Sequence, residues 1–200
     1  MRDSGPSTEA RERVLEAAER LFAERGYSSV TLRDIAADVG IRHTSLYHHV
    51  PGGKEELFIE VTERTLQRHR DGLTETLAQA APDVRAQLQA AANWLLSQPP
   101  MDLIRMVYSD MPSIDPAHAG RLSQVAYDSM LGPIEAVLAH AGAQGEIEHH
   151  NFGLIAGGIL GMLEALHAVP QHVFDEDPTL ARRGMAYELI DTLLNGLRKR

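Results

Sequence analysis

Residues 31–49 read TLRDIAADVGIRHTSLYHH, and this stretch decides the fold of the N-terminal part of the chain. Thr31 followed by Asp34 three residues later is a capping-box pattern, which marks the start of a helix. Apolar residues then recur at helical spacing, and Gly40 supplies the left-handed residue that commonly ends a helix. The apolar residues are Leu32, Ile35, Ala36 and Val39. The pattern predicts a helix that opens at Thr31 and stops at a turn formed by Gly40 and Ile41.

A second, short helix is expected directly after this turn, at about residues 42–49. Two helices joined by a tight turn form a helix-turn-helix motif, whose second helix enters the major groove of DNA. Leu46 can face inward, while the other side chains offer hydrogen-bonding groups to base edges and phosphates. The outward-facing candidates are Arg42, His43, Thr44, Ser45 and His48. An ordinary polar surface helix would show the same periodicity.

Prolines and glycines divide the rest of the chain into segments with helical periodicity and no alternating strand pattern. The expected helices cover about residues 8–25, 54–77, 83–98, 101–111, 116–142 with a kink or split at Pro133, 148–168 and 178–197. The sequence therefore predicts an all-α fold of about nine helices. We expect two domains, a helix-turn-helix DNA-binding domain over residues 1–53 and a larger helical domain over residues 54–200.

The composition of the 200-residue chain, with 44% apolar and 24% charged residues, is that of a globular protein. The absence of cysteine excludes disulfides, thiolate metal sites and a catalytic thiol, and it suits a reducing cytoplasm. The first residues lack the apolar core of a signal peptide. The apolar stretch 152–169 is shorter than the roughly 20 residues of a membrane span and contains Glu164 and His167, so we expect a buried helix there and a cytoplasmic protein.

The charge is unevenly distributed. The whole chain has a formal net charge of −9, which by itself argues against nonspecific binding to nucleic acid. Between Arg25 and Lys54, however, four basic residues face two acidic ones, with three histidines beside them. The sequence therefore predicts that one surface of the N-terminal part meets a nucleic acid.

From Arg13 to Leu57 the sequence resembles the DNA-binding half of the tetracycline-repressor (TetR) family. The matching residues are Val14, Leu15, Ala17, Ala18, Leu21, Phe22, Gly26, Tyr27, Thr31, Leu32, Ile35, Ala36, Val39, Gly40, Ile41, Leu46, Tyr47, His48, His49, Lys54, Glu55 and Leu57. This resemblance implies a homodimeric, ligand-responsive transcriptional regulator, in particular a repressor, which leaves its operator when a small lipophilic effector binds.

The resemblance also implies roles for individual residues. Thr31 and Lys54 would bind phosphates, and Tyr47 and His48 would approach the DNA backbone. Bases or adjacent phosphates would be contacted by Arg33, Arg42, His43, Thr44 and Ser45. The expected helix starts support the first pair, because free backbone amides at a helix N-terminus favour a phosphate.

Three residues depart from the family's pattern. The family commonly has a small capping residue where Arg42 stands, a small residue where Thr44 stands and phenylalanine where Val50 stands. Arginine cannot cap a helix, and valine fills less space than phenylalanine. Operator preference therefore cannot be copied from relatives, and a dimeric binding protein that has lost DNA binding is an alternative.

Metal binding and catalysis have little support in the sequence. His43, His48 and His49 lack the i, i+4 spacing of a helical zinc site, so we expect no metal and no cofactor. Glu164 and His167 form one Glu-x-x-His pair, whereas a di-iron bundle needs two. The sequence has no nucleophile elbow, no phosphate-binding glycine loop and no HExxH, so we expect no enzyme.

The last two helices are candidates for a dimer interface. In the first, bulky apolar residues form one face and small residues form the other, which lets a second backbone approach closely. The small face contains Gly157, Gly158, Gly161, Ala165 and Ala168, and the last helix carries Leu180, Gly184, Tyr187, Ile190, Leu194 and Leu197. The resemblance implies a four-helix interface between helices 148–168 and 178–197 of two copies, and packing within the monomer is the alternative.

Between these segments lies a region rich in methionine and aromatic residues, which suits a pocket for an apolar or aromatic ligand. The candidate ligand-binding residues are Trp94, Tyr108, Met111, Tyr127, Met130, Phe152, Met162, Glu164 and His167. Glu164 and His167 could form the polar end of this pocket. Packing of an ordinary core would need the same apolar residues.

Overall fold

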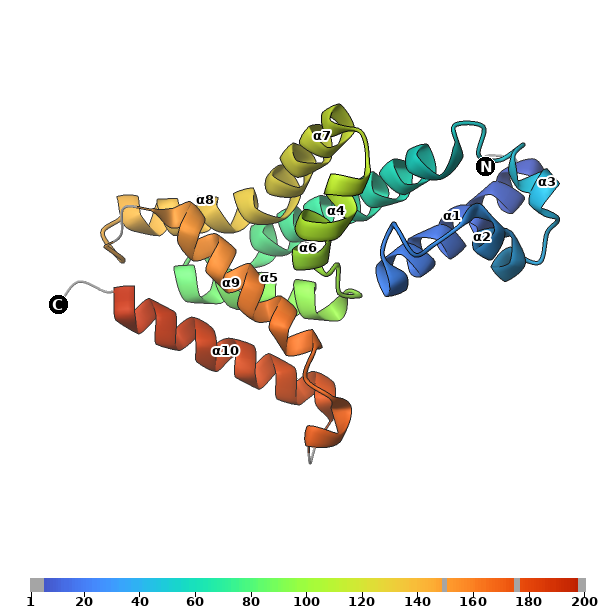
Figure 1. Ribbon diagram of the computed structural model, residues 1–200. Coiled ribbons are helices and arrows are strands. Elements are labelled where there is room, and N and C mark those ends of the chain that lie inside the picture. The colour runs from blue at the N-terminus through green and yellow to red at the C-terminus, as the bar shows by residue number, and fades with distance from the viewer. Residues whose placement is uncertain (1–5, 149–150, 175–176, 198–200) are drawn as a thin grey trace. The chain divides into compact units, whose positions relative to one another are not determined.

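The computed structural model describes residues 6–148, 151–174 and 177–197 (Figure 1). Every regular element in these ranges is helical, which confirms the predicted all-α fold. The α-helices are α1 (Pro6–Arg25), α2 (Leu32–Val39), α3 (His43–Leu46), α4 (Gly53–Gln79), α5 (Val84–Ser97), α6 (Leu103–Arg105), α7 (Pro116–Ala126), α8 (Gly132–Ala143), α9 (Phe152–His167) and α10 (Pro178–Leu197). Tighter or wider helical segments are η1 (Met106–Asp110), η2 (Met111–Ser113), η3 (Tyr127–Leu131) and η4 (Gln171–Val173). No helix in the described ranges is long and apolar enough to cross a membrane.

The chain packs as two compact units. The first comprises the residues up to Thr65 together with Asp102–Gln124, and the second comprises Leu66–Met101 together with the chain from Val125 onward. Helix α4 contributes its N-terminal half to the first unit and the remainder to the second. The segment 102–124 thus packs with the helix-turn-helix, although it lies far along the chain.

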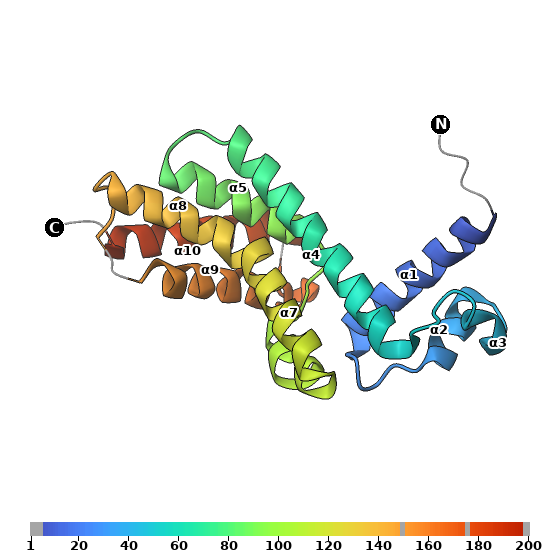
Figure 2. The same cartoon turned by 90° about the horizontal axis from the view of Figure 1, so that it is seen from above.

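In the first unit, α1, α2 and α3 gather against the N-terminal half of α4 (Figure 2). The apolar face of α1 is buried, and Phe22, Tyr27 and Phe58 form an aromatic cluster in which the rings of Phe22 and Phe58 meet edge to face at 5.2 Å. Other large buried side chains are Val14, Leu21, Ile35, Leu46 and Leu57. This core fixes the angle between α2 and α3.

Two predicted helices are shorter or less regular than expected. Helix α3 ends at Leu46 instead of His49, because Arg42 makes no side-chain capping bond and the following amides turn back to carbonyls three residues earlier. The helix predicted over residues 101–111 is a single α-turn that Asp102 caps, followed by the π-helical η1 and the 3-10 turn η2 at Pro112.

The break predicted at Pro133 is confirmed. Helix α7 ends at Ala126, the π-helical η3 follows it, and α8 begins at Gly132 with Pro133 in its first turn. Proline has no backbone N–H to donate to the preceding turn, which accounts for the interruption.

In the second unit, α5 packs against α8, α9 and α10. The inner faces of these four helices form its core, in which the large buried side chains include Leu88, Ile134, Leu138, Ile159, Ile190 and Leu194. Gly72 of α4 lies directly under Trp94: a Cβ atom at Gly72 would sit 2.0 Å from Trp94 Cζ2. Helix α9 begins after Asn151, which caps it, and residues 149–150 of the predicted helix lie outside the described residues.

Candidate nucleic-acid interface

The start of α2 is a complete capping box. Thr31 Oγ1 accepts the Asp34 N–H at 3.2 Å, and the Asp34 carboxylate accepts both the Thr31 N–H at 2.8 Å and the Thr31 hydroxyl at 2.6 Å. These hydrogen bonds from Thr31 lower the pKa of Asp34. Because the Thr31 hydroxyl already donates to Asp34, a phosphate at this helix start would meet backbone N–H groups of the first turn instead of this hydroxyl.

Helix α3 presents a mixed surface. Leu46 and Val50 are buried beneath it, so the smaller Val50 still closes the core. Arg42, Thr44, Tyr47 and His48 are exposed, and so is Arg33 on α2, whereas His43 and Ser45 are half-buried. The His43 ring meets the Tyr47 ring edge to face at 5.1 Å. The candidates for base contacts therefore lie on α2, on α3 and in the turns that flank α3.

Lys54 is less accessible than the sequence suggested. Its ammonium group donates to the Tyr27 carbonyl oxygen at 3.0 Å and lies 4.0 Å from the centre of the Tyr27 ring. Burial lowers the pKa of Lys54. An ammonium group has three hydrogens, so contact with a phosphate would add to its bond with Tyr27.

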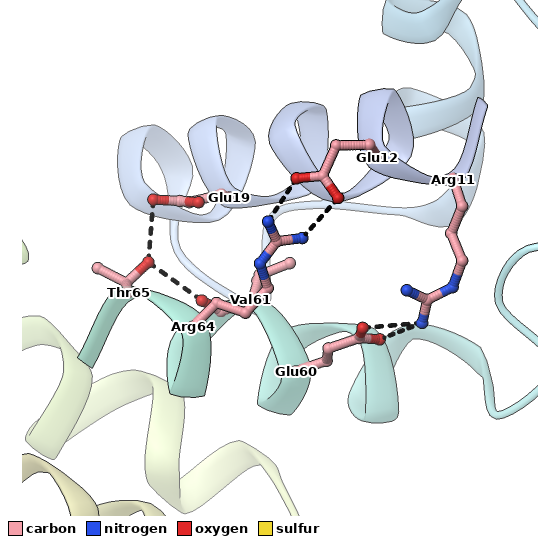
Figure 3. A network of polar contacts seen from close by, with 7 residues as sticks. All are labelled: Arg11, Glu12, Glu19, Glu60, Val61, Arg64 and Thr65. Carbon is pink, nitrogen blue, oxygen red and sulfur yellow. Dashed lines mark hydrogen bonds and ion pairs between the residues drawn. The ribbon is translucent and has the colours of Figure 1, made fainter. Parts of the chain in front are cut away.

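Some arginines of the first unit are neutralised by ion pairs between α1 and α4. Figure 3 shows that Arg11 of α1 pairs with Glu60 of α4, and that Arg64 of α4 pairs back with Glu12 of α1. The Thr65 hydroxyl adds a bond to Glu19 at 2.9 Å. The bond from Arg64 lowers the pKa of Glu12.

Not every arginine of the first unit is held in an ion pair. Arg20 pairs with Asp38, whereas Arg25, Arg33 and Arg42 form no ion pair with any residue that the structure describes. Exposed cations of the first unit without an ion pair among the described residues therefore include Arg33 on α2 and Arg42 directly before α3.

Sequence reasoning missed the residues that hold the end of α1. The Asp110 carboxylate accepts the Tyr27 N–H at 2.8 Å, and the Arg105 guanidinium donates to the carbonyl oxygens of Phe22 and Ala23. Asp110 is buried, with 3% of its surface exposed. The only signal in the sequence was a charged pair, Arg105 and Asp110, on either side of an apolar run, which does not say what the pair contacts.

The nine candidate ligand-binding residues do not come together as one described site. Tyr108 and Met111 belong to the first unit, where Tyr108 is 81% exposed, and the other seven belong to the second. There Met130 is buried, the Tyr127 hydroxyl donates to Glu135, and Phe152 packs on Gly142. Met162, Glu164 and His167 lie half-buried along α9.

A groove of about 460 Å³ in the second unit has a different lining. Its walls come from α4, α5, η3 and α8, and they consist of Arg70, Thr74, Leu77, Gln87, Asp128, Pro133, Ala136, Val137 and His140. None of the nine candidates takes part in it. The Trp94 indole N–H is nevertheless buried without an acceptor among the described residues, so one candidate keeps an unused donor.

The burial of His167 predicts that the stability of the second unit depends on pH. Burial lowers the pKa of His167, and a hydrogen bond with the Leu95 backbone acts in the opposite direction. The folded state thus favours neutral imidazole, so this contribution is present above the unfolded pKa of about 6.5 and is lost as the pH falls. We expect the Tm to drop between pH 7 and pH 5, and to drop less in His167→Gln. Equal drops in this variant and in His172→Gln, which changes an exposed histidine, would contradict the assignment.

The predicted dimer surface is only partly free. On α9, Gly158 and Gly161 have nothing within 4 Å of where a Cβ would lie, and Leu154 is 65% exposed. On α10, Leu180, Gly184 and Met185 are exposed. Three residues of the predicted α10 stripe face the core of the second unit instead, because α10 packs on α5. Ile190 and Leu194 are buried, and the Tyr187 hydroxyl forms a hydrogen bond with Asn93.

Comparison with known proteins agrees with this geometry. Residues 14–61 match the sequence profile of the bacterial regulatory proteins of the tetR family. The HTH-type transcriptional regulator LmrA of Bacillus subtilis is 37% identical over 82 residues, which cover 41% of this chain and 43% of that protein. The HTH-type transcriptional repressor KstR2 of Mycobacterium tuberculosis is 42% identical over 74 residues, covering 35% of this chain and 36% of that protein. The chain thus matches less than half the length of these curated relatives.

Solved structures extend the likeness in fold to nearly the whole chain. A tetR-family regulatory protein from Rhodococcus RHA1 gives a TM-score of 0.75 at 18% identity, covering 96% of this chain and 98% of that one. AibR, solved in complex with isovaleryl coenzyme A and operator DNA, gives a TM-score of 0.72 at 18% identity, covering 88% and 96%. A Saccharomonospora viridis regulator in complex with choline gives 0.69 at 23% identity, covering 96% and 100%.

Fold and interface together define a helix-turn-helix protein with an all-helical body. Within it, residues 14–61 match the tetR family of bacterial regulatory proteins. The predicted resemblance of the N-terminal part to the DNA-binding half of this family is therefore confirmed.

Proposed function

We propose that the protein is a homodimeric transcriptional repressor that binds a pseudo-palindromic operator in the cytoplasm and is released by a small lipophilic effector. The observation that carries this proposal is the helix-turn-helix of α2 and α3, whose exposed Arg33 and Arg42 have no ion-pair partner among the described residues. Domain 1–53 would read DNA, and domain 54–200 would bind the effector and the second copy. An electrophoretic mobility shift with DNA upstream of the protein's own gene tests it. Failure to retard any DNA at low salt would identify a binding protein without DNA affinity.

Arg42 offers the sharpest test of base contacts. Replacement by alanine should weaken operator binding by about 1–3 kcal/mol and relax the preference at one base position, because arginine can pair with guanine through two hydrogen bonds. Arg11→Ala is the matched control, since Arg11 is already paired with Glu60. Fluorescence anisotropy with single-base operator variants measures both effects. Equal losses of operator affinity in Arg42→Ala and Arg11→Ala would show that Arg42 makes no specific contact with a base.

Homodimer formation is supported by the open glycine face of α9 and the exposed apolar residues of α10. A two-fold axis between the copies would set two recognition helices about 34–36 Å apart, which is one turn of DNA. An operator with two inverted half-sites at this spacing is therefore expected. Footprinting of the retarded DNA would show it as two protected segments on one face.

The effector would bind in the second unit. Support comes from the unused Trp94 indole donor and from fold neighbours solved with isovaleryl coenzyme A and with choline. An effector would act by binding more tightly to a conformation that has low operator affinity. Release of operator DNA by candidate apolar compounds, together with a rise in Tm, would identify it, whereas increased operator affinity would identify a corepressor.

A further inference from the structure

We propose that Asp110 and Arg105 are positioning residues for the DNA interface, which hold the end of α1 and, through Tyr27, the ammonium group of Lys54. This inference rests on the proposed DNA binding and adds a part of the chain outside the helix-turn-helix. All of its residues lie in the first compact unit. We call the pair Asp110 and Arg105 the latch.

Asp110 provides the first half of the latch. Its carboxylate is buried and accepts the Tyr27 N–H at 2.8 Å, directly after α1 ends. Gly26 makes the approach possible: its φ of +78° is left-handed, and a Cβ there would meet Asp110 Oδ1 at 3.1 Å and Arg105 Cδ at 3.2 Å. A buried carboxylate needs such partners, because an unpaired charge in this position is costly.

Arg105 provides the second half. Its Nη2 donates to the carbonyl oxygens of Phe22 at 3.2 Å and Ala23 at 2.6 Å, in the last turn of α1. The Phe22 carbonyl also accepts the Gly26 N–H at 2.9 Å, whereas the carbonyls that follow it lack partners within the helix. A cation at a helix C-terminus is favoured by the helix dipole. Arg105 Nε lies 3.5 Å from Asp110 Oδ2, so the two side chains also neutralise each other.

Tyr27 connects the latch with Lys54. Its N–H binds Asp110, its carbonyl oxygen accepts a hydrogen from Lys54 Nζ, and its ring lies under the ammonium group. The position of Asp110 therefore fixes the backbone of Tyr27, and the Tyr27 carbonyl in turn positions the Lys54 ammonium group at the start of α4. One hydrogen of the ammonium group is held this way, which orients the other two for a phosphate.

The backbone of this segment is unusual on both sides of Arg105. Asp102 is the one described non-glycine residue with a positive φ, at +49°, and η1 is π-helical up to Asp110. Sparsely populated backbone conformations and π-segments persist where the surroundings hold them, often at functional sites. The latch supplies such surroundings.

Asp110→Asn tests the latch on the DNA fragment that the unmodified protein retards. Asparagine keeps the shape and one acceptor but loses the charge that pairs with Arg105. We expect about tenfold weaker binding, within the 5- to 150-fold range usual for coupled sites. The dependence of log Kd on log salt should also flatten by about one phosphate contact, as it should in Lys54→Ala.

The double variant Lys54→Ala/Asp110→Asn separates positioning from a general loss of fold. If Asp110 acts through Lys54, the double variant binds no more weakly than Lys54→Ala alone; additive losses, or an unchanged salt dependence in Asp110→Asn, would overturn the proposal. Val107→Ala, at a 52% exposed site of the same π-segment, is the control and should bind normally.

Two further outcomes have clear meanings. If Asp110→Asn fails to fold by circular dichroism, Arg105→Lys takes its place in the same cycle, because lysine keeps the charge and loses the planar guanidinium group whose Nη2 donates to two carbonyls. If the unmodified protein binds DNA and both variants match it, the latch is wrong while the proposed function stands. If the unmodified protein binds no DNA, the proposed function itself has failed.

Discussion

Replacing Gly161 with arginine should convert the protein from a dimer into a monomer and abolish tight operator binding. Gly161 lies on the exposed small face of α9, where an added Cβ atom would have no neighbour within 4 Å. In the proposed four-helix interface the same side chain would bury an unpaired charge, at a cost of about 3–5 kcal/mol. Since each 1.4 kcal/mol is a factor of ten, dimerisation should weaken by at least about 100-fold. Sedimentation equilibrium and operator titration measure the two effects.

Gly120→Arg is the matched control for this experiment. Gly120 lies in α7, is exposed and has the same empty surroundings, so the added charge and the lost glycine are identical. The control should remain dimeric. A Gly161→Arg protein that is still a dimer would place the interface on another surface and remove the support for the predicted operator spacing.

Replacing Gly72 with alanine should destabilise the protein, although alanine is the better helix former. The new Cβ would lie 2.0 Å from Trp94 Cζ2 and 2.2 Å from Cε2, so the indole must move. Overpacking of this kind typically costs about 1–3 kcal/mol, which exceeds the gain of about 1 kcal/mol in helix propensity. Urea unfolding followed by circular dichroism gives the free energy of unfolding.

Gly120→Ala, in α7 and outside the proposed dimer interface, is expected to change the free energy of unfolding in the opposite direction. Nothing lies near the position of its Cβ, so the variant should gain up to about 1 kcal/mol. Trp94→Leu combined with Gly72→Ala should recover much of the loss, because a smaller side chain makes room for the new methyl group. A stable Gly72→Ala protein without this second change would show that the indole can move at little cost.

Much of the fold could be predicted from the sequence because its signals are local. The capping box of Thr31 and Asp34, the stop at Gly40 and the break before Pro133 depend on residues a few positions apart, and all are confirmed. The length of α3 was overestimated for a local reason as well. Arg42 cannot cap, and the helix gives way to turns after Leu46.

The candidate sites were predicted less completely. Residue type identified Arg42 and Lys54 as cations of the N-terminal part, but it could not show that Tyr27 holds Lys54 or that Arg11 is neutralised by Glu60. The methionine and aromatic residues predicted as a ligand site are shared between two units, since apolar composition alone does not distinguish a pocket from a core.

The sequence by itself determined where most of the helices lie and that two of them form a helix-turn-helix. Hydrogen bonds and side-chain contacts within a helix join residues close in the chain, and their spacing is therefore visible in the sequence. Only the tertiary structure decided what holds the end of α1. Asp110 reaches Tyr27 across 83 residues of chain, and such a contact depends on how the helices pack, which no local spacing encodes.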